Sequence, residues 1–181
     1  MLHGPRVDLR AQVEEDVPVL HAELYEDVEM RSRSDGAAWR PRPLGASPLA
    51  PREPDDKVAG FSVVVRETGG LAGSALLWGI DQHNRLAHVG ISLRPTMRGH
   101  GYGREVVEVL SDYAFRVLGL HRLQLETLAD NDAMIAVALH CGFELEGRSR
   151  ESSWVDGGFR DDVVFGLLAP AWQAREGERT T

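Results

Sequence analysis

The sequence predicts an α/β (α+β) fold with a single mixed, mostly antiparallel sheet of six to seven strands and helices on both faces. Strand patterns, with alternating or continuous apolar residues, occur at 6–12, 61–67, 71–80, 86–93, 121–129, 143–155 and 159–169. Helical spacing of apolar residues occurs at 14–27, from the glycines near 101 to about 118, and at 131–142. Three strand segments follow one another directly between 61 and 93, so uniform βαβ repeats and a doubly wound dinucleotide fold are disfavoured.

Each element carries its own signal in chain order. The segment 14–27 starts with acidic residues, which favour a helix start, and 69–70 is a two-glycine hairpin turn. Asn131 can start the helix at 131–142, and Gly142 can end it. The last two strand segments are separated by the turn sequence "DGG". These signals justify the boundaries of the predicted elements.

The chain length of 181 residues suits one domain, which we take to span 1–181. Residues 40–56 contain five prolines without periodicity, so we expect a variable loop region over 31–57. It is either a lid on the substrate side or a plain connection. Residues 173–181 are expected to form a polar tail.

Composition excludes several classes of protein. The net charge is −8, with 20 basic against 28 acidic residues, which argues against a nucleic-acid partner held through phosphates. Cys141 is the single cysteine, so neither an internal disulfide nor a cysteine-based zinc site can form, and we expect no metal. No apolar run approaches the length of a membrane span or a signal sequence, so we expect a cytoplasmic protein without a membrane partner.

The glycine-rich stretch "RGHGYG" lies between a strand and a helix. Glycines allow close approach of a ligand, and a helix N-terminus attracts phosphate groups. The spacing does not match the dinucleotide pattern, and the P-loop lysine is missing. The pattern [RQ]-x-x-G-x-[GA] does match, from Arg98 to Gly103. The alternative is a glycine turn that only caps the helix.

In this context the chain resembles the GNAT superfamily of acyl-CoA-dependent N-acyltransferases, and most closely the ribosomal-protein N-terminal acetyltransferase branch. The resemblance runs from about residue 6 to 172 and rests on "VGISLRPTMRGHGYGREVVEVLSDYAF", "LGLHRLQLETLADNDAMIAVALHCGFELEGR" and "DGGFRDDVVFGLL". It implies the acyl-CoA N-acyltransferase fold and acetyl-CoA (coenzyme A) as co-substrate. It also implies direct attack by a primary amine, either a peptide N-terminus or a small molecule, in a ternary complex.

The resemblance also implies which residues bind the co-substrate. The pyrophosphate would be held by Arg98, Gly99, His100, Gly101, Tyr102, Gly103 and Arg104. The pantetheine amides would pair with Ile91, Ser92 and Leu93, at a splayed edge of the strand at 86–93. Asn131 matches an asparagine that holds the pantetheine arm, although it also suits a plain helix cap. The chain departs from the family at two positions: Ala138 replaces a proton-donating tyrosine, as is common in this branch, and Met134 replaces a cofactor-contacting serine.

Two residues are candidates for the general base that deprotonates the amine. His88 occupies a strand position where the branch frequently has glutamate, and an imidazole can accept a proton near neutral pH. Glu126, on the neighbouring strand, is the second candidate. The alternatives are a hydrogen-bonded core histidine and a salt-bridge partner. Cys141 raises the option of an acyl-enzyme, against the alternative of a core position.

The acceptor side is expected to include Tyr25, Trp39, Trp154 and Asp161. Each of these side chains also suits a packing role. The resemblance suggests a homodimer formed through the C-terminal hairpin. A non-catalytic acyl-CoA-binding or sensor module of the same fold is the alternative function, and a nucleotide-phosphate enzyme is a third class.

Overall fold

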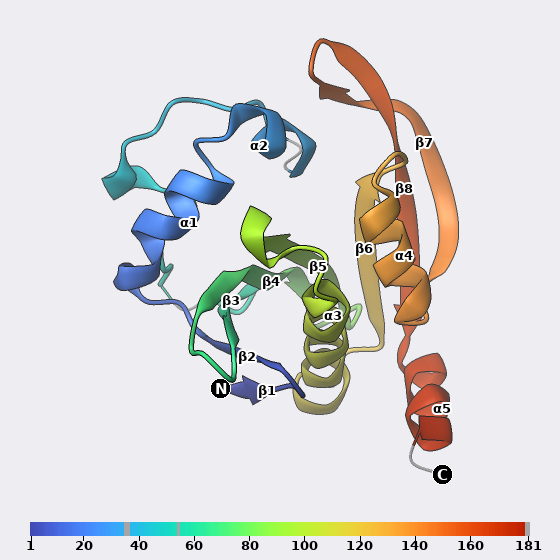
Figure 1. Ribbon diagram of the computed structural model, residues 1–181. Coiled ribbons are helices and arrows are strands. Elements are labelled where there is room, and N and C mark those ends of the chain that lie inside the picture. The colour runs from blue at the N-terminus through green and yellow to red at the C-terminus, as the bar shows by residue number, and fades with distance from the viewer. Residues whose placement is uncertain (35–36, 54, 180–181) are drawn as a thin grey trace.

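The computed structural model describes residues 1–34, 37–53 and 55–179. They form one mixed sheet of eight strands in the order β1-β2-β3-β4-β5-β6-β8-β7, with helices packed around it (Figure 1). The strands are β1 (Leu2–His3), β2 (Val7–Ala11), β3 (Val58–Val65), β4 (Leu71–Asp81), β5 (Leu86–Leu93), β6 (Arg122–Leu128), β7 (Glu144–Val155) and β8 (Gly158–Leu168). The predicted fold class is confirmed. The strand beyond the predicted seven is β1, whose two residues are too few to show a period.

The helices are α1 (Val17–Leu24), α2 (Val28–Ser34), α3 (Tyr102–Asp112), α4 (Asp132–His140) and α5 (Ala169–Arg179). A π-helical turn, Tyr113–Val117, extends α3, and short 3₁₀ turns occupy Glu14–Asp16, Leu44–Ala46 and Pro95–Met97. The single helix expected at 14–27 is divided, because α1 ends at Leu24 and the Asp27 carboxylate accepts a hydrogen bond from the Met30 N–H at the start of α2. Helix α2 therefore enters the region that we expected as a variable loop.

Helices cover both faces of the sheet, as predicted. Val63 on β3 belongs to the main apolar core, together with Val106 and Leu110 of α3. Its neighbour Ser62 points to the opposite face, because side chains alternate along a strand. There the Ser62 hydroxyl donates a hydrogen bond to Asp16, just before α1. Helices α1 and α3 thus pack on opposite faces.

The sheet changes direction and opens between β5 and β6. Strands β1 to β5 pair antiparallel in sequence, whereas β5 and β6 pair in parallel. Within the described chain, that parallel pairing joins only Leu86–His88 to Arg122–Gln124. Beyond His88 the two strands separate, and β6, β8 and β7 continue as an antiparallel unit (Figure 1). Among the described residues, the end of β5 therefore has no neighbouring strand on the side of β6.

The C-terminal segment differs from the expected polar tail. Residues 173–179 continue α5 rather than extending as a tail, while 180–181 lie outside the described residues. Trp172 is 3% exposed and packs against Phe115 with a ring-centroid distance of 6.2 Å. Arg175 donates a hydrogen bond to the His140 carbonyl. Burial of one large aromatic ring therefore anchors a helix that otherwise shows a polar sequence. None of the described helices is both long and apolar enough to cross a membrane.

Candidate active site

A cleft of about 1560 Å³ opens where β5 and β6 separate. One wall comes from β4 and β5, the other from β6, the start of α4 and the β7–β8 hairpin, and α2 with the loop after it closes one side. The cleft contains many of the predicted site residues: His88, Ile91, Ser92, Glu126, Asn131, Trp39 and Trp154. Three of the chain's four tryptophans line it, with Trp78 as the third.

The predicted glycine loop connects the end of β5 to the N-terminus of α3. Gly101 occupies the N-cap position with φ of 79°, in the left-handed region that glycine adopts without strain. No side chain in the described ranges caps this helix end, so its first N–H groups are available to a ligand. Gly99 also has a positive φ, and a Cβ there would meet no described atom within 4 Å. The loop has the donor set and the open space that a pyrophosphate requires.

The two arginines that bracket this loop have partners of their own. The Arg98 Nε donates to the Leu93 carbonyl at 3.0 Å, and the Arg104 Nε lies 3.2 Å from the Glu108 carboxylate, one helical turn away. His100 and Tyr102 stack their rings with centroids 5.6 Å apart. Gly103 lies inside α3, close to the side chains of Ile91 and Leu93. The loop and the end of β5 thus form one continuous surface.

The two candidate bases face each other at the point where the strands separate. His88 Nδ1 lies 3.7 Å from Glu126 Oε1, and Gln124 donates a hydrogen bond to the same carboxylate oxygen at 2.5 Å. The His88 ring stacks on Trp78, with centroids 4.1 Å apart and an interplanar angle of 21°. His88 Nδ1 is buried without a hydrogen-bond partner among the described residues. His21 Nε2 and Trp172 Nε1 are likewise buried without a hydrogen-bond partner among the described residues, so the feature that distinguishes the His88 ring is its place in the cleft beside Glu126.

Asn131 is the N-cap of α4 and also lines the cleft. Its side chain accepts a hydrogen bond from the Met134 N–H at 3.2 Å and donates one to Thr127 at 2.9 Å. Ala138 is fully buried, and its methyl side chain has no proton to donate. Cys141 is also fully buried, 3.6 Å from the Arg104 carbonyl. The core role of Cys141 is therefore favoured over an acyl-enzyme.

The acceptor-side expectations divide into two groups. Trp39 and Trp154 line the cleft. Tyr25 does not, because it is 4% exposed and lies behind Trp39: the Trp39 indole donates to the Tyr25 carbonyl, and the Tyr25 hydroxyl donates to the Arg40 carbonyl. Tyr25 thus supports the loop that carries Trp39 and is not itself a lining residue.

Asp161 also lies away from the cleft. Its carboxylate accepts a hydrogen bond from the Glu151 N–H at 2.8 Å and pairs with Arg148 at 2.6 Å. The Glu151 N–H bond, followed by the Arg148 contact, lowers the pKa of Asp161. The adjacent Asp162 lines the cleft instead and accepts hydrogen bonds from Ser152 and Ser153.

Among the cleft residues that the sequence analysis did not name, Trp78 and Asp162 bear most directly on the chemistry of the site. Trp78 is the direct cross-strand partner of His88 in the β4–β5 pair, so the register of that hairpin could have revealed it. Asp162 follows Asp161 directly, and strand alternation places consecutive side chains on opposite faces. Its discovery required knowing which face of β8 points into the cleft.

The chain resembles known acetyltransferases over most of its length. Residues 6–144 match the family model described as the acetyltransferase (GNAT) domain. A putative ribosomal N-acetyltransferase, YdaF, of Bacillus subtilis (strain 168) is 33% identical over 111 residues, which cover 61% of this chain and 59% of that protein. A spermidine N(1)-acetyltransferase of Vibrio cholerae is 30% identical over 91 residues, covering 50% of this chain and 53% of that protein. The matches thus span between half and three fifths of these curated relatives.

Solved structures agree on the fold. The crystal structure of spermidine N-acetyltransferase from Vibrio cholerae in complex with CoA and spermine superposes with a TM-score of 0.81 and 21% sequence identity. The superposition covers 93% of this chain and 98% of that chain. The relatives include the [ribosomal protein uS5]-alanine N-acetyltransferase of Escherichia coli (strain K12), as the sequence resemblance led us to expect, and also spermidine N(1)-acetyltransferases. Because the family model matches well over half of the sequence, the chain belongs to the GNAT acetyltransferase family.

Proposed function

We propose that this protein is an acetyl-CoA-dependent N-acetyltransferase that acts on a primary amine. The observation that carries the proposal is the continuity of one surface. The end of β5, which is unpaired with β6 beyond His88 in the described chain, runs directly into the glycine loop at the N-terminus of α3. An extended pantetheine arm can add to a free strand edge, and a pyrophosphate suits the adjoining helix start.

The residues proposed to hold acetyl-CoA follow this surface. Ile91, Ser92 and Leu93 offer backbone groups to the pantetheine amides, and the loop 98–104 offers N–H groups to the pyrophosphate. Asn131 lies across the cleft from β5, where its amide can reach the same arm. Bound acetyl-CoA would supply an activated acetyl group, which passes to the amine as a C–N bond forms, the C–S bond breaks and coenzyme A leaves as the thiolate.

His88 is the proposed general base. It accepts the proton that the attacking amine loses, directly or through a water molecule. Glu126, at 3.7 Å from Nδ1, stabilises the imidazolium that results. Trp78 holds the ring in place by stacking. A backbone N–H on β5 stabilises the developing oxyanion. Much of the rate acceleration is expected to come from holding both substrates together in a ternary complex.

The acceptor is proposed to be a cationic amine with some apolar surface. The cleft presents the carboxylates of Glu126 and Asp162 together with the faces of Trp39, Trp78 and Trp154. Carboxylates and aromatic rings both attract ammonium groups. Peptide N-termini and small amines, including polyamines, remain within this class. A homodimer formed through the C-terminal hairpin and a cytoplasmic location remain predictions.

A non-catalytic acyl-CoA-binding module is the second candidate. The alanine at position 138 favours it, because the tyrosine that often donates a proton to the thiolate in this family is missing. Binding and turnover separate the two candidates.

The experiment combines thermal unfolding with a thiol-release assay. Acetyl-CoA at 100 times its Kd should stabilise the protein by about 2.7 kcal/mol, which raises Tm by several degrees. CoA release is then measured with peptides of varied N-terminus and with mono-, di- and polyamines. Stabilisation with turnover supports the enzyme, and stabilisation without turnover by any amine supports the binding module. No stabilisation, with ATP and NAD as comparison ligands, contradicts both.

A further inference from the structure

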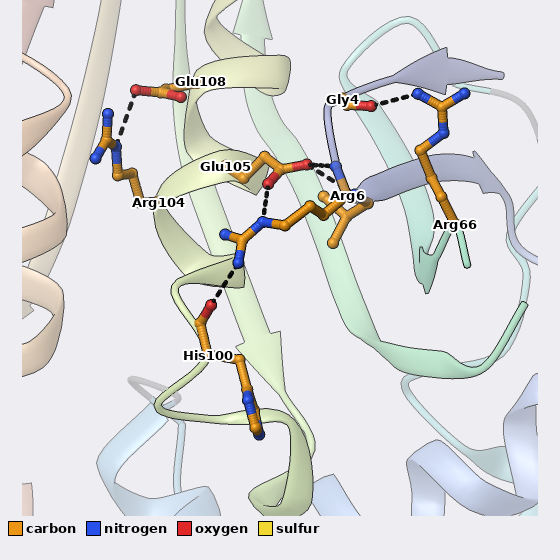
Figure 2. Close-up of polar contacts among 8 residues, drawn as sticks. Gly4, Arg6, Arg66, His100, Arg104, Glu105 and Glu108 are labelled. Carbon is orange, nitrogen blue, oxygen red and sulfur yellow. Dashed lines mark hydrogen bonds and ion pairs between the residues drawn. The ribbon is translucent and has the colours of Figure 1, made fainter. Parts of the chain in front are cut away.

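Arg6 joins the first long strand to the glycine loop. It lies directly before β2, and its side chain crosses to the start of α3 (Figure 2). The guanidinium donates from Nε to Glu105 Oε2 at 3.1 Å and from Nη1 to the His100 carbonyl at 3.0 Å (Figure 2). It also lies over the Tyr102 ring, 5.3 Å from the centroid. One side chain therefore contacts three positions of the loop and the first turn of α3.

Glu105 fixes Arg6 in this position. It is 5% exposed, and its Oε1 accepts hydrogen bonds from the backbone N–H groups of Arg6 and Val7 at 2.5 and 2.7 Å. A Cβ at Gly4 would lie 2.8 Å from the same oxygen, so a glycine makes room for the carboxylate. Charge-assisted hydrogen bonds of this kind are strong, and a buried carboxylate requires them. The carboxylate thus holds both the backbone and the guanidinium of Arg6.

The contact with His100 determines where a loop donor points. A peptide group is planar and trans, so the His100 carbonyl and the Gly101 N–H point in opposite directions. By binding that carbonyl, Arg6 fixes the plane of the peptide and directs the Gly101 N–H away from itself. Arg6 Nη2 also lies only 3.2 Å from the place where a Cβ of Gly101 would be.

We propose that Arg6 is a positioning residue for the pyrophosphate of coenzyme A, acting through the His100–Gly101 peptide; this rests on the proposed function. The effect is mainly geometric, because Glu105 balances the charge of Arg6. Lysine is a poor substitute, since a single ammonium does not reproduce the forked contacts with Glu105 and His100.

The test compares ligands with and without a pyrophosphate. Calorimetry gives the Kd of CoA, and an NMR titration gives the Kd of pantetheine, which lacks the pyrophosphate and the nucleotide. Arg6→Ala should raise the CoA Kd about tenfold. This is the loss expected when one charge-assisted hydrogen bond, from the Gly101 N–H to the pyrophosphate, is no longer directed at the ligand. The pantetheine Kd should stay within about twofold of the wild-type value, and Arg6→Lys should recover only part of the CoA affinity.

Arg66→Ala is the matched control. Arg66 also donates to a backbone carbonyl near the chain start, that of Gly4 at 2.8 Å (Figure 2). Among the described residues its guanidinium pairs with Asp8 and does not contact the glycine loop. The Arg66→Ala protein should bind CoA with the wild-type Kd. If Arg6→Ala folds poorly, Arg6→Met replaces it, because methionine keeps the apolar stem but has no donor for the His100 carbonyl, and the same loss of CoA affinity is expected.

Each outcome either supports or overturns the positioning role of Arg6. A loss of affinity for CoA alone supports the positioning role. Equal losses for CoA and pantetheine indicate a general structural role and overturn it, as does an unchanged CoA Kd in Arg6→Ala. If the wild-type protein binds no CoA, the proposed function itself fails, and the positioning role fails with it.

Discussion

Two glycines of the loop should respond in opposite directions to the same substitution. Gly101 has φ of 79°, where an L-residue costs about 1–2 kcal/mol, and its new methyl group would lie 3.2 Å from Arg6 Nη2. Gly103 is the second residue of α3, and alanine is favoured over glycine in a helix by up to about 1 kcal/mol. A Cβ at Gly103 would contact Ile91 Cδ1 at 3.4 Å and Leu93 Cδ1 at 3.8 Å, which is ordinary packing. Gly101→Ala should therefore destabilise the protein, and Gly103→Ala should stabilise it.

Thermal unfolding and calorimetry check both variants. For a domain of this size, 1 kcal/mol corresponds to about 2–4 °C in Tm, so Gly101→Ala should lower Tm by about 2–8 °C and Gly103→Ala should raise it by up to about 4 °C. Gly101→Ala should also weaken CoA binding, because the Arg6 contact has to move. Gly103→Ala should keep its affinity, since the loop pattern accepts alanine at that position. Shifts of the same sign, or a loss of CoA affinity in Gly103→Ala, would refute this account of the loop.

Further substitutions test the base, the C-terminal helix and the acid stability. His88→Gln should lower kcat by about 10²- to 10⁴-fold without changing the CoA Kd, with Glu126→Gln as the comparison in a pH–rate profile. Trp172→Ala should lower the free energy of unfolding by about 3–5 kcal/mol in urea, because the ring is 3% exposed. Burial raises the pKa of Asp16, but hydrogen bonds from Arg10 and Ser62 outweigh it and hold the pKa below its usual value. Its contribution to stability is thus present above the unfolded pKa of about 3.9 and lost as pH falls through the folded value, so Asp16→Asn should flatten the acid limb of stability against pH.

The fold was predictable because its signals are local. Strand alternation, the two-glycine hairpin and the spacing of 99, 101 and 103 each depend on a few neighbouring residues. The structure keeps these local features: Gly101 is the N-cap of α3, and Asn131 is the N-cap of α4. The separation of β5 from β6 was not visible in either strand alone. It depends on where two distant segments stop pairing, and only the family resemblance suggested it.

The residues on the acceptor side of the cleft were harder to predict, because the direction of each side chain decides whether it lines the cleft. Asp161 and Asp162 are equivalent in composition, yet only Asp162 lines the cleft, since one step along a strand reverses the face. Similarly, Tyr25 and Trp39 are joined by a hydrogen bond, but only Trp39 reaches the cleft. The boundary between α1 and α2 was missed as well, although the Asp27 carboxylate accepts a hydrogen bond from the Met30 N–H at the start of α2. Aromatic and acidic residues can be recognised in the sequence, whereas their direction comes from tertiary structure.

The site around Arg6 combines a local signal that the sequence shows with distant contacts that it does not show. The loop that Arg6 supports is recognisable from six consecutive residues, but Arg6 is 99 positions from Glu105 and 94 from His100. A backbone motif supplies donors without fixing their directions, because glycine allows many conformations. The directions have to come from outside the motif, and here a buried carboxylate and one guanidinium provide them. A search for the motif alone therefore identifies the ligand class but misses the residue on which the affinity of the site is proposed to depend.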